Sequence, residues 1–170
     1  MREEDVPMLR RWLLLPHVRR WWEDDPEERD YPEGTIRDWM EAVRGEDPTD
    51  MFVIHMDTRP IGVIQSYRVD DHPEYAAQIA VGGPAIGVDV FIADVALIGK
   101  GHGPALLREF LRLSFDRYRI DYCVIGPTKT NVAAIRAYEK AGFRHLKEYR
   151  EDDTKDPPHV LLDIHRADLA

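Results

Sequence analysis

Apolar residues in the first quarter of the chain recur at the spacing of an amphipathic helix. The pattern predicts three helices, over "DVPMLRRWLL", "HVRRWW" and "IRDWMEAVR". Thr35 is expected to cap the third helix at its N-terminus, and Gly45 is expected to end it. The polar segment "EDDPEERDYPEG" separates the second helix from the third and contains prolines, so we expect a loop there.

The middle of the chain is rich in β-branched and aromatic residues, which favour strands. "MFVIHM" and "IGVIQSYRV" flank the turn sequence from Asp57 to Pro60, so they predict a hairpin. A loop is expected over residues 70–85, where Pro and Gly recur. The next segment, "GVDVFIADVAL", is mostly apolar and β-branched, which predicts a central strand.

Helix and strand patterns alternate in the second half of the chain. "GPALLREFLRLSF" predicts an amphipathic helix, and "NVAAIRAYEKAG" predicts another that ends at Gly142 and is capped by Thr130 or Asn131. Further strands are expected over "DYCVIG", "FRHLKEYR" and "HVLLDIHR". The side chains expected to face inward from the first of these helices are Leu106, Leu107, Phe110 and Leu113. The order of elements predicts one mixed α/β domain over residues 1–170.

Composition narrows the class of protein. The chain has 170 residues, 44% hydrophobic and 32% charged, which is typical of one globular domain. Its apolar runs stay short of the ~20 residues that span a bilayer, and no targeting segment is recognisable. Cys123 is the only cysteine, which excludes a disulfide framework and a structural zinc site. A reducing, cytoplasmic setting is therefore expected.

The net charge of the chain indicates which partners it attracts. The formal value is −9. A surface this acidic repels the phosphates of nucleic acids and attracts polycations, so we expect no nucleic-acid partner. The same charge also fits a protein that is only kept in solution by its acidity.

Three glycines alternate with other residues in "LIGKGHGPALL", at positions 99, 101 and 103. They lie between a predicted strand and a predicted helix, where the first N–H groups of the helix lack intrahelical partners and the helix dipole is positive. Glycines let an anion approach these amides closely, and Lys100 adds positive charge. The pattern fits a pyrophosphate site and fits equally a tight turn that needs glycine dihedrals. It matches neither a Walker P-loop nor the dinucleotide-binding fingerprint.

Together with the later segment "TNVAAIRAYEKAGF", the glycines resemble the GNAT superfamily of acetyl-CoA-dependent N-acetyltransferases. Members carry Gln/Arg-x-x-Gly-x-Gly/Ala at a strand-to-helix turn, which Ile98 to Gly103 match here. They then carry Asn-x-x-Ala-x-x-x-Tyr-x-x-x-Gly-Phe, which Asn131 to Phe143 match. Ile98 departs from the usual Gln or Arg, and Pro104 removes one amide donor, but neither abolishes the turn.

The resemblance implies a fold, a co-substrate and a mechanism. The fold would be a single GNAT-like α/β domain with a mixed, mostly antiparallel central sheet, splayed strands and flanking helices. Acetyl-CoA would be the co-substrate, with no metal, and an amine would attack its thioester directly. Tyr138 would protonate the departing thiolate. The residues implied in coenzyme A binding are Phe91, Ile92, Ala93, Gly99, Lys100, Gly101, His102, Gly103, Asn131 and Tyr138.

Within the superfamily the chain most resembles the aminoglycoside 6'-N-acetyltransferases. The matching segments run nearly end to end and include "HVRRWWE", "PIGVIQSY", "GVDVFIA" and "DPPHVLL". The resemblance implies acetylation of the 6'-amine of aminoglycoside antibiotics, and hence resistance, with Asp89 facing the acceptor pocket. A carboxylate in an apolar strand is costly to bury without a partner, which a cationic amine or a local Arg or Lys would supply.

Further carboxylates and aromatic side chains are implied in the acceptor site. Asp89 is the first candidate for the catalytic group that removes a proton from the attacking amine, and Glu74 is the second. The residues expected to bind the acceptor are Trp22, Tyr67, Glu74, Asp89 and Asp156. Well-known members have an aspartate after the fifth strand, where this chain has Gly126, so one expected ammonium contact is missing.

Two other functions fit the sequence. One is acyl transfer to a different amine, such as a hydroxylamine-bearing siderophore precursor or a protein amine. Relatives of the siderophore type tend to carry a histidine where this chain has Asp89, which argues against them. The other is a non-catalytic module that binds acyl-CoA, and the intact glycine turn, Asn131 and Tyr138 argue against it. We expect a cytoplasmic monomer or homodimer with a small polycationic amine as its substrate and no membrane partner.

Overall fold

The computed structural model describes residues 1–23, 30–150 and 157–169 of the chain. The chain divides into two compact units. Unit 1 contains Met1–Gln65 and Asp89–Leu97, and unit 2 contains Ser66–Val88 and Ile98–Ala170. The single domain expected over residues 1–170 stays a prediction.

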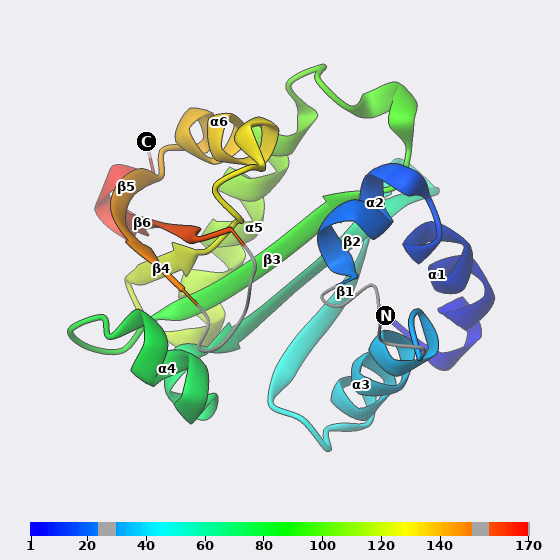
Figure 1. The fold of residues 1–170 in the computed structure, drawn as a ribbon, viewed down its shortest axis with the longest axis horizontal. Coiled ribbons are helices and arrows are strands. Elements are labelled where there is room, and N and C mark those ends of the chain that lie inside the picture. Colours follow the sequence, from blue (N-terminus) through cyan, green and yellow to red (C-terminus); the bar gives the residue numbers. More distant parts are fainter. Residues whose placement is uncertain (24–29, 151–156, 170) are drawn as a thin grey trace. The chain divides into compact units, whose positions relative to one another are not determined.

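The described residues contain one sheet of six strands, in the order β1-β2-β3-β4-β6-β5 (Figure 1). The strands are β1 (Thr49–Met56), β2 (Arg59–Arg68), β3 (Ile86–Ile92), β4 (Tyr122–Ile125), β5 (Arg144–Tyr149) and β6 (His159–His165). β3 runs parallel to β4, whereas β4 and β5 are both antiparallel to β6. The predicted fold class, a mixed sheet with flanking helices, is confirmed.

The strand β3 pairs with β4 at its beginning. Its register with β4 covers Ile86 and Gly87, which pair with Cys123 and Val124 in unit 2. From Asp89 onwards β3 belongs to unit 1. The ladder with β4 therefore ends early, as expected for a sheet with splayed strands.

Unit 1 buries one face of each of its α-helices in a shared apolar core. These helices are α1 (Val6–Leu13), α2 (Pro16–Trp22) and α3 (Glu33–Arg44), and the short helix η1 (Glu3–Asp5) precedes them. α1 packs against α2 and α3, and α3 packs against β1 (Figure 1). The core residues are Leu9, Leu13, Val18, Ile36, Trp39, Met40, Met51, Val63, Phe91 and Ala93. The predicted helices and hairpin are confirmed, and the hairpin turn is shorter than predicted because β2 already begins at Arg59.

The helix α3 begins earlier than predicted, so the expectation for Thr35 is wrong. The N-cap is Pro32, and the Ile36 N–H already donates to the Pro32 carbonyl at 3.0 Å. Thr35 is therefore a residue of the first helical turn, whereas a capping residue lies just before that turn. Gly45 ends the helix as predicted, with a φ of 77°.

Unit 2 contains the helices η2 (Val69–Asp71), α4 (Pro73–Ile79), α5 (His102–Tyr118), α6 (Val132–Ala141) and η4 (Arg166–Asp168). α5 and α6 pack against each other. The guanidinium group of Arg108 on α5 donates to the Lys140 carbonyl near the end of α6, at 2.8 Å. This bond satisfies a carbonyl that the helix leaves unpaired, and it fixes the two helices together. The residues of the core cluster in this unit are Val69, Ile79, Ala85, Val124 and Leu161.

Two predicted element boundaries in the middle of the chain are wrong. The loop expected over residues 70–85 contains α4, which begins at Pro73, a residue suited to the first helical position. The strand expected over residues 87–97 ends at Ile92 and is followed by η3 (Val95–Leu97). The Asp94 carboxylate accepts a hydrogen bond from the Ala96 N–H at 2.9 Å, which favours a turn at this point.

The helix α5 buries a different face from the predicted one. Leu107, Leu111 and Phe115 are buried, whereas Leu113 is 62% exposed. Leu106 and Phe110 are half-buried, so the inward face is rotated by about one position. None of the helices within the described ranges is long and apolar enough to cross a membrane.

A substitution at Gly62 tests how closely β2 and β3 approach each other in unit 1. A Cβ at this position would overlap the backbone carbonyl oxygen of Phe91. We predict that Gly62→Ala lowers the free energy of unfolding by about 1–3 kcal/mol in urea denaturation, because one backbone must move. Gly82→Ala is the matched control, since a Cβ there meets nothing within 4 Å. Equal stability of the two variants would contradict the close approach.

Candidate functional site

The glycine segment of unit 2 forms a left-handed turn before α5. Gly99 and Gly101 have φ values of 74° and 84°, and Gly101 is the N-cap of α5. A Cβ at either position, or at Gly103, would meet nothing within 4 Å. Glycine is required at 99 and 101 for its dihedrals, and the space in front of all three is open.

The first amides of α5 face this open space. His102 and Gly103 are the first two helical residues, so their N–H groups have no carbonyl four residues earlier within the helix. Pro104 follows, is buried and has no N–H. The exposed Lys100 lies within the turn. The segment therefore presents backbone donors, a helix dipole and one cationic side chain, a combination that suits a phosphate group.

The second motif lies on α6, which packs against α5. Asn131, not Thr130, caps α6, and its side chain accepts a hydrogen bond from the Ala134 N–H at 3.2 Å. Tyr138 lies two turns further along the same face and is 8% exposed. Its ring centroid is 6.2 Å from that of Phe143. Tyr138 thus has the packing contacts of a core residue, with its hydroxyl at the tip of the ring.

The end of β3 and the residue that follows it, both in unit 1, each use one backbone group within the unit. The Ala93 N–H donates to the Ile61 carbonyl at 2.7 Å. The Ile92 carbonyl accepts a hydrogen bond from Nε2 of His17 at 3.2 Å. The Phe91 side chain is buried, with Trp12, Trp22 and Trp39 around it.

Asp89 begins the unit 1 part of β3, and its side chain is half-buried. Its Oδ2 accepts a hydrogen bond from Nε2 of Gln65 on β2 at 2.9 Å. A charged acceptor shortens and strengthens such a bond, which orients the carboxylate. The Gln65 amide carries no charge, so this contact orients the carboxylate by hydrogen bonding and not by forming an ion pair.

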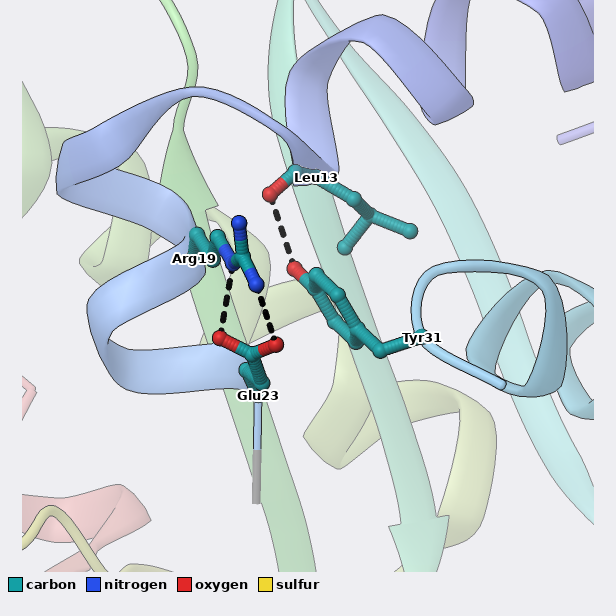
Figure 2. Close-up of polar contacts among 4 residues, drawn as sticks. All are labelled: Leu13, Arg19, Glu23 and Tyr31. Atoms are coloured by element: carbon teal, nitrogen blue, oxygen red, sulfur yellow. Dashed lines mark hydrogen bonds and ion pairs between the residues drawn. The ribbon is translucent and has the colours of Figure 1, made fainter. Parts of the chain in front are cut away.

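Trp22 closes α2 and packs in the core of unit 1. Its ring centroid lies 5.2 Å from that of Phe91 and 5.6 Å from that of Trp39. Figure 2 shows how the end of α2 is held: Arg19 donates two hydrogen bonds to Glu23 at 2.7 Å, and the Tyr31 hydroxyl donates to the Leu13 carbonyl at 2.8 Å. The bonds from Arg19 lower the pKa of the Glu23 carboxyl. Both contacts fix the chain on either side of residues 24–29.

The remaining expected acceptor residues lie in different surroundings. Tyr67, in unit 2, has its ring centroid 4.7 Å from that of His72 and covers Gly87. Glu74 is exposed in the first turn of α4. Asp156 lies outside the described residues.

Gly126, where the sequence lacks the expected aspartate, lies directly after β4. A Cβ on Gly126 would overlap the hydroxyl oxygen of Tyr149, so a tyrosine from β5 fills the space of the missing side chain. The sequence pattern did not indicate Tyr149 as a site residue, because its position on a short polar strand carries no motif. Among the described residues, no group of three or more His, Cys, Asp or Glu is arranged to hold a metal ion.

Residues 2–150 of the chain match the sequence profile of the acetyltransferase (GNAT) domain family. The chain belongs to this family. An aminoglycoside N(6')-acetyltransferase type 1 from Klebsiella pneumoniae is 29% identical over 143 residues, which cover 84% of this chain and 71% of the relative. A kanamycin resistance protein from Rhizobium radiobacter is 39% identical over 57 residues, 34% of this chain and 53% of the relative.

Solved structures agree with the sequence relatives. The crystal structure of aminoglycoside acetyltransferase AAC(6')-Ib with coenzyme A and kanamycin has a TM-score of 0.76 and 26% identity, and covers 99% of this chain and 93% of that one. An aminoglycoside N(6')-acetyltransferase from Legionella pneumophila has a TM-score of 0.79 at 23% identity, covering 99% and 91%, and shares the fold. The resemblance to GNAT enzymes of the aminoglycoside 6'-acetyltransferase type is confirmed.

Proposed function

We propose that this chain transfers the acetyl group of acetyl-CoA to the 6'-amine of aminoglycoside antibiotics. The observation that carries the proposal is the similarity to an aminoglycoside N(6')-acetyltransferase across 84% of the chain. The neighbouring structure that holds coenzyme A and kanamycin adds support for both substrates. A cytoplasmic location and a monomeric or homodimeric state complete the proposal.

Coenzyme A is proposed to bind with its pyrophosphate at residues 99–103. The observed geometry fits this group, because the glycine turn leaves open space in front of the first amides of α5. Lys100 and His102 add side-chain donors. The backbone groups of residues 91–93 other than the Ile92 carbonyl and the Ala93 N–H, which are bonded to His17 and Ile61, would hold the pantetheine arm. The Asn131 side chain, whose oxygen caps α6, would offer its amide N–H donors to the coenzyme.

Acetyl-CoA supplies the acetyl group as a thioester. Tyr138 is proposed to donate its hydroxyl proton to the sulfur as the thiolate departs. The burial of its ring would fix the position of the hydroxyl, so that packing and acid catalysis are served by one side chain.

Asp89 is proposed to receive the amine of the acceptor. The amine is protonated in solution and must lose a proton before it can attack, and the carboxylate would accept that proton directly or through water. The hydrogen bond from Gln65 would hold the carboxylate in one orientation. Glu74 is the second candidate for the base, and Trp22, Tyr67 and Asp156 complete the proposed acceptor site.

The function is tested with two aminoglycosides that differ only in having an amine or a hydroxyl at the 6' position. Thiol release from acetyl-CoA is measured with each compound, and with polyamines and lysine peptides as other amine classes. The proposal expects turnover of the 6'-amine compound alone, with the acetyl group located on that nitrogen by NMR of the product. Turnover restricted to peptides or hydroxylamines would overturn it, and binding of coenzyme A without turnover would indicate a non-catalytic module.

Substitutions at Gly101 and Gly103 test the coenzyme site, one with added backbone strain and one without it. We predict that Gly101→Ala and Gly103→Ala both weaken coenzyme A binding by about tenfold or more in calorimetry, because each methyl group lies where phosphate oxygens approach. Gly101→Ala also costs about 1–2 kcal/mol of stability from its left-handed φ, whereas Gly103→Ala does not. Gly45→Ala is the control, because its φ of 77° brings a similar strain far from the site in sequence. Unchanged affinity in both test variants would remove the assignment.

Tyr138→Phe separates acid catalysis from packing, because it keeps the ring and deletes only the hydroxyl. We predict a fall in kcat of about 10²–10⁴-fold, with the dissociation constant of acetyl-CoA nearly unchanged. The melting temperature serves as the control for packing. Activity within twofold of the wild type would assign the proton to water or to another side chain.

Asp89→Asn keeps the shape of the side chain and removes its charge, and its carbonyl oxygen still accepts from Gln65. We predict that kcat/KM for the aminoglycoside falls at least ~10-fold, which corresponds to about 1.4 kcal/mol. Added salt should raise the KM of the wild type more than that of the variant, because salt screens the lost charge pair. A lowered melting temperature with normal kinetics would instead make Asp89 an anchor of the sheet, and a larger loss in Glu74→Gln would move the base to Glu74.

A further inference from the structure

Three buried polar atoms of unit 2 have no hydrogen-bond partner among the described residues. They are Nε2 of His72, Oγ1 of Thr128 and Nδ1 of His159. Burying a polar atom without a partner costs free energy, so most such atoms in native proteins are satisfied. Three of them in one unit therefore suggest that something other than the fold itself uses these atoms.

A row of aromatic rings runs from His72 to His159, and Thr128 pairs with His159 through the backbone. The Tyr149 ring is stacked on His159 at a centroid distance of 5.2 Å and meets the edge of Tyr75 at 6.4 Å. Tyr75 in turn lies 6.1 Å from Tyr67, whose ring is 4.7 Å from that of His72. We call these five residues the aromatic row. The row combines flat apolar faces with polar edges, as ligand sites that bind ring-shaped molecules do.

The backbone on both sides of Thr128 and His159 is hydrogen-bonded, so an irregular loop does not explain the unpartnered side-chain atoms. The two residues form an antiparallel bridge. The Lys129 N–H donates to the Pro158 carbonyl at 2.8 Å, and the Val160 N–H donates to the Pro127 carbonyl at 2.9 Å. This backbone pairing positions Thr128 and His159 but provides no hydrogen-bond partner for Oγ1 of Thr128 or Nδ1 of His159.

The unpartnered polar atoms at this end of the row belong to a hydroxyl group and an imidazole ring. Two charged side chains next to Thr128 and Tyr149 in the sequence, Lys129 and Glu148, form an ion pair with each other at 2.8 Å. Gly126 brings no side chain, and the Tyr149 hydroxyl fills the space beside it. The missing carboxylate after β4 is thus replaced by a phenol, which offers a hydrogen bond but no negative charge.

We propose that the aromatic row and Thr128 bind a neutral, hydroxyl-bearing ring of the acceptor. This proposal rests on the proposed function and assigns a part of the acceptor site. A ligand hydroxyl both donates and accepts, so it satisfies a threonine hydroxyl and an imidazole nitrogen in either tautomer. The C–H face of a sugar ring packs on the tyrosine rings, while an ammonium group prefers a carboxylate such as Asp89. Thr128, Tyr149 and His159 therefore select for ring hydroxyls.

Thr128→Val tests this site, because it keeps the shape of the side chain and removes only the unpartnered hydroxyl. We expect the melting temperature to stay the same or to rise, since a buried unsatisfied atom is lost. We expect the KM for a hydroxylated aminoglycoside to rise about fivefold or more, with the KM for acetyl-CoA unchanged. The increase should disappear for a deoxy analogue that lacks the ring hydroxyl in question. Gly126→Ala, which displaces the Tyr149 hydroxyl, should raise the same KM.

Thr130→Val is the matched control, because Thr130 is exposed two residues further on and should give wild-type values. An unchanged KM for the aminoglycoside in both Thr128→Val and Gly126→Ala would contradict the proposal that these residues bind a ring of the acceptor. A lowered melting temperature of Thr128→Val with unchanged kinetics would also overturn it, since the hydroxyl would then serve the fold. These results require that the wild type acetylates the aminoglycoside; a wild type that does not would overturn the proposed function itself.

Discussion

The left-handed turn at Gly99 and Gly101 decides where α5 begins and what its first amides face. Side chains rarely adopt the φ values found there, so the turn restricts both positions to glycine and leaves the space before the helix open. The 17 residues of α5 then align their dipoles behind those amides. Because Arg108 joins α5 to the end of α6, the same turn also fixes the helix that carries Asn131 and Tyr138. One backbone constraint thus organises both sequence motifs of the family.

Unit 1 has an aromatic core and, on the same strand as Phe91, the half-buried carboxylate of Asp89. Its large aromatic residues are used for the core, where Trp22 and Trp39 surround Phe91. The carboxylate of Asp89 stands out against this apolar background, and Gln65 orients it without neutralising it. A rigid apolar support beneath one oriented charge is what a site for a cationic amine requires. The aromatic rings that we propose for contact with an acceptor lie instead in unit 2, around Tyr67 and Tyr149.

Sequence periodicity predicted the strands, the long helices and the glycine turn, because each follows from local spacing. It failed where one local signal competed with another. Thr35 has a capping side chain, but Pro32 already starts the helix, and the Asp94 carboxylate ends β3 before the apolar pattern does. The predicted inward face of α5 differs from the observed one by about one position, because the helix carries leucines on more than one face and spacing alone does not decide which of them is buried. The unpartnered Thr128 and His159 atoms follow from tertiary packing alone, which no spacing along the chain reveals.

Hydrogen exchange measured by mass spectrometry, with and without coenzyme A, tests the central claim of this account most directly. If the glycine turn presents the amides of α5 to the pyrophosphate, coenzyme A should slow exchange in peptides that cover residues 98–105. A subsequent addition of a 6'-amino aminoglycoside should slow exchange around residues 87–92 and 126–130. Protection by coenzyme A that is absent from residues 98–105 and appears elsewhere in the chain would contradict the account.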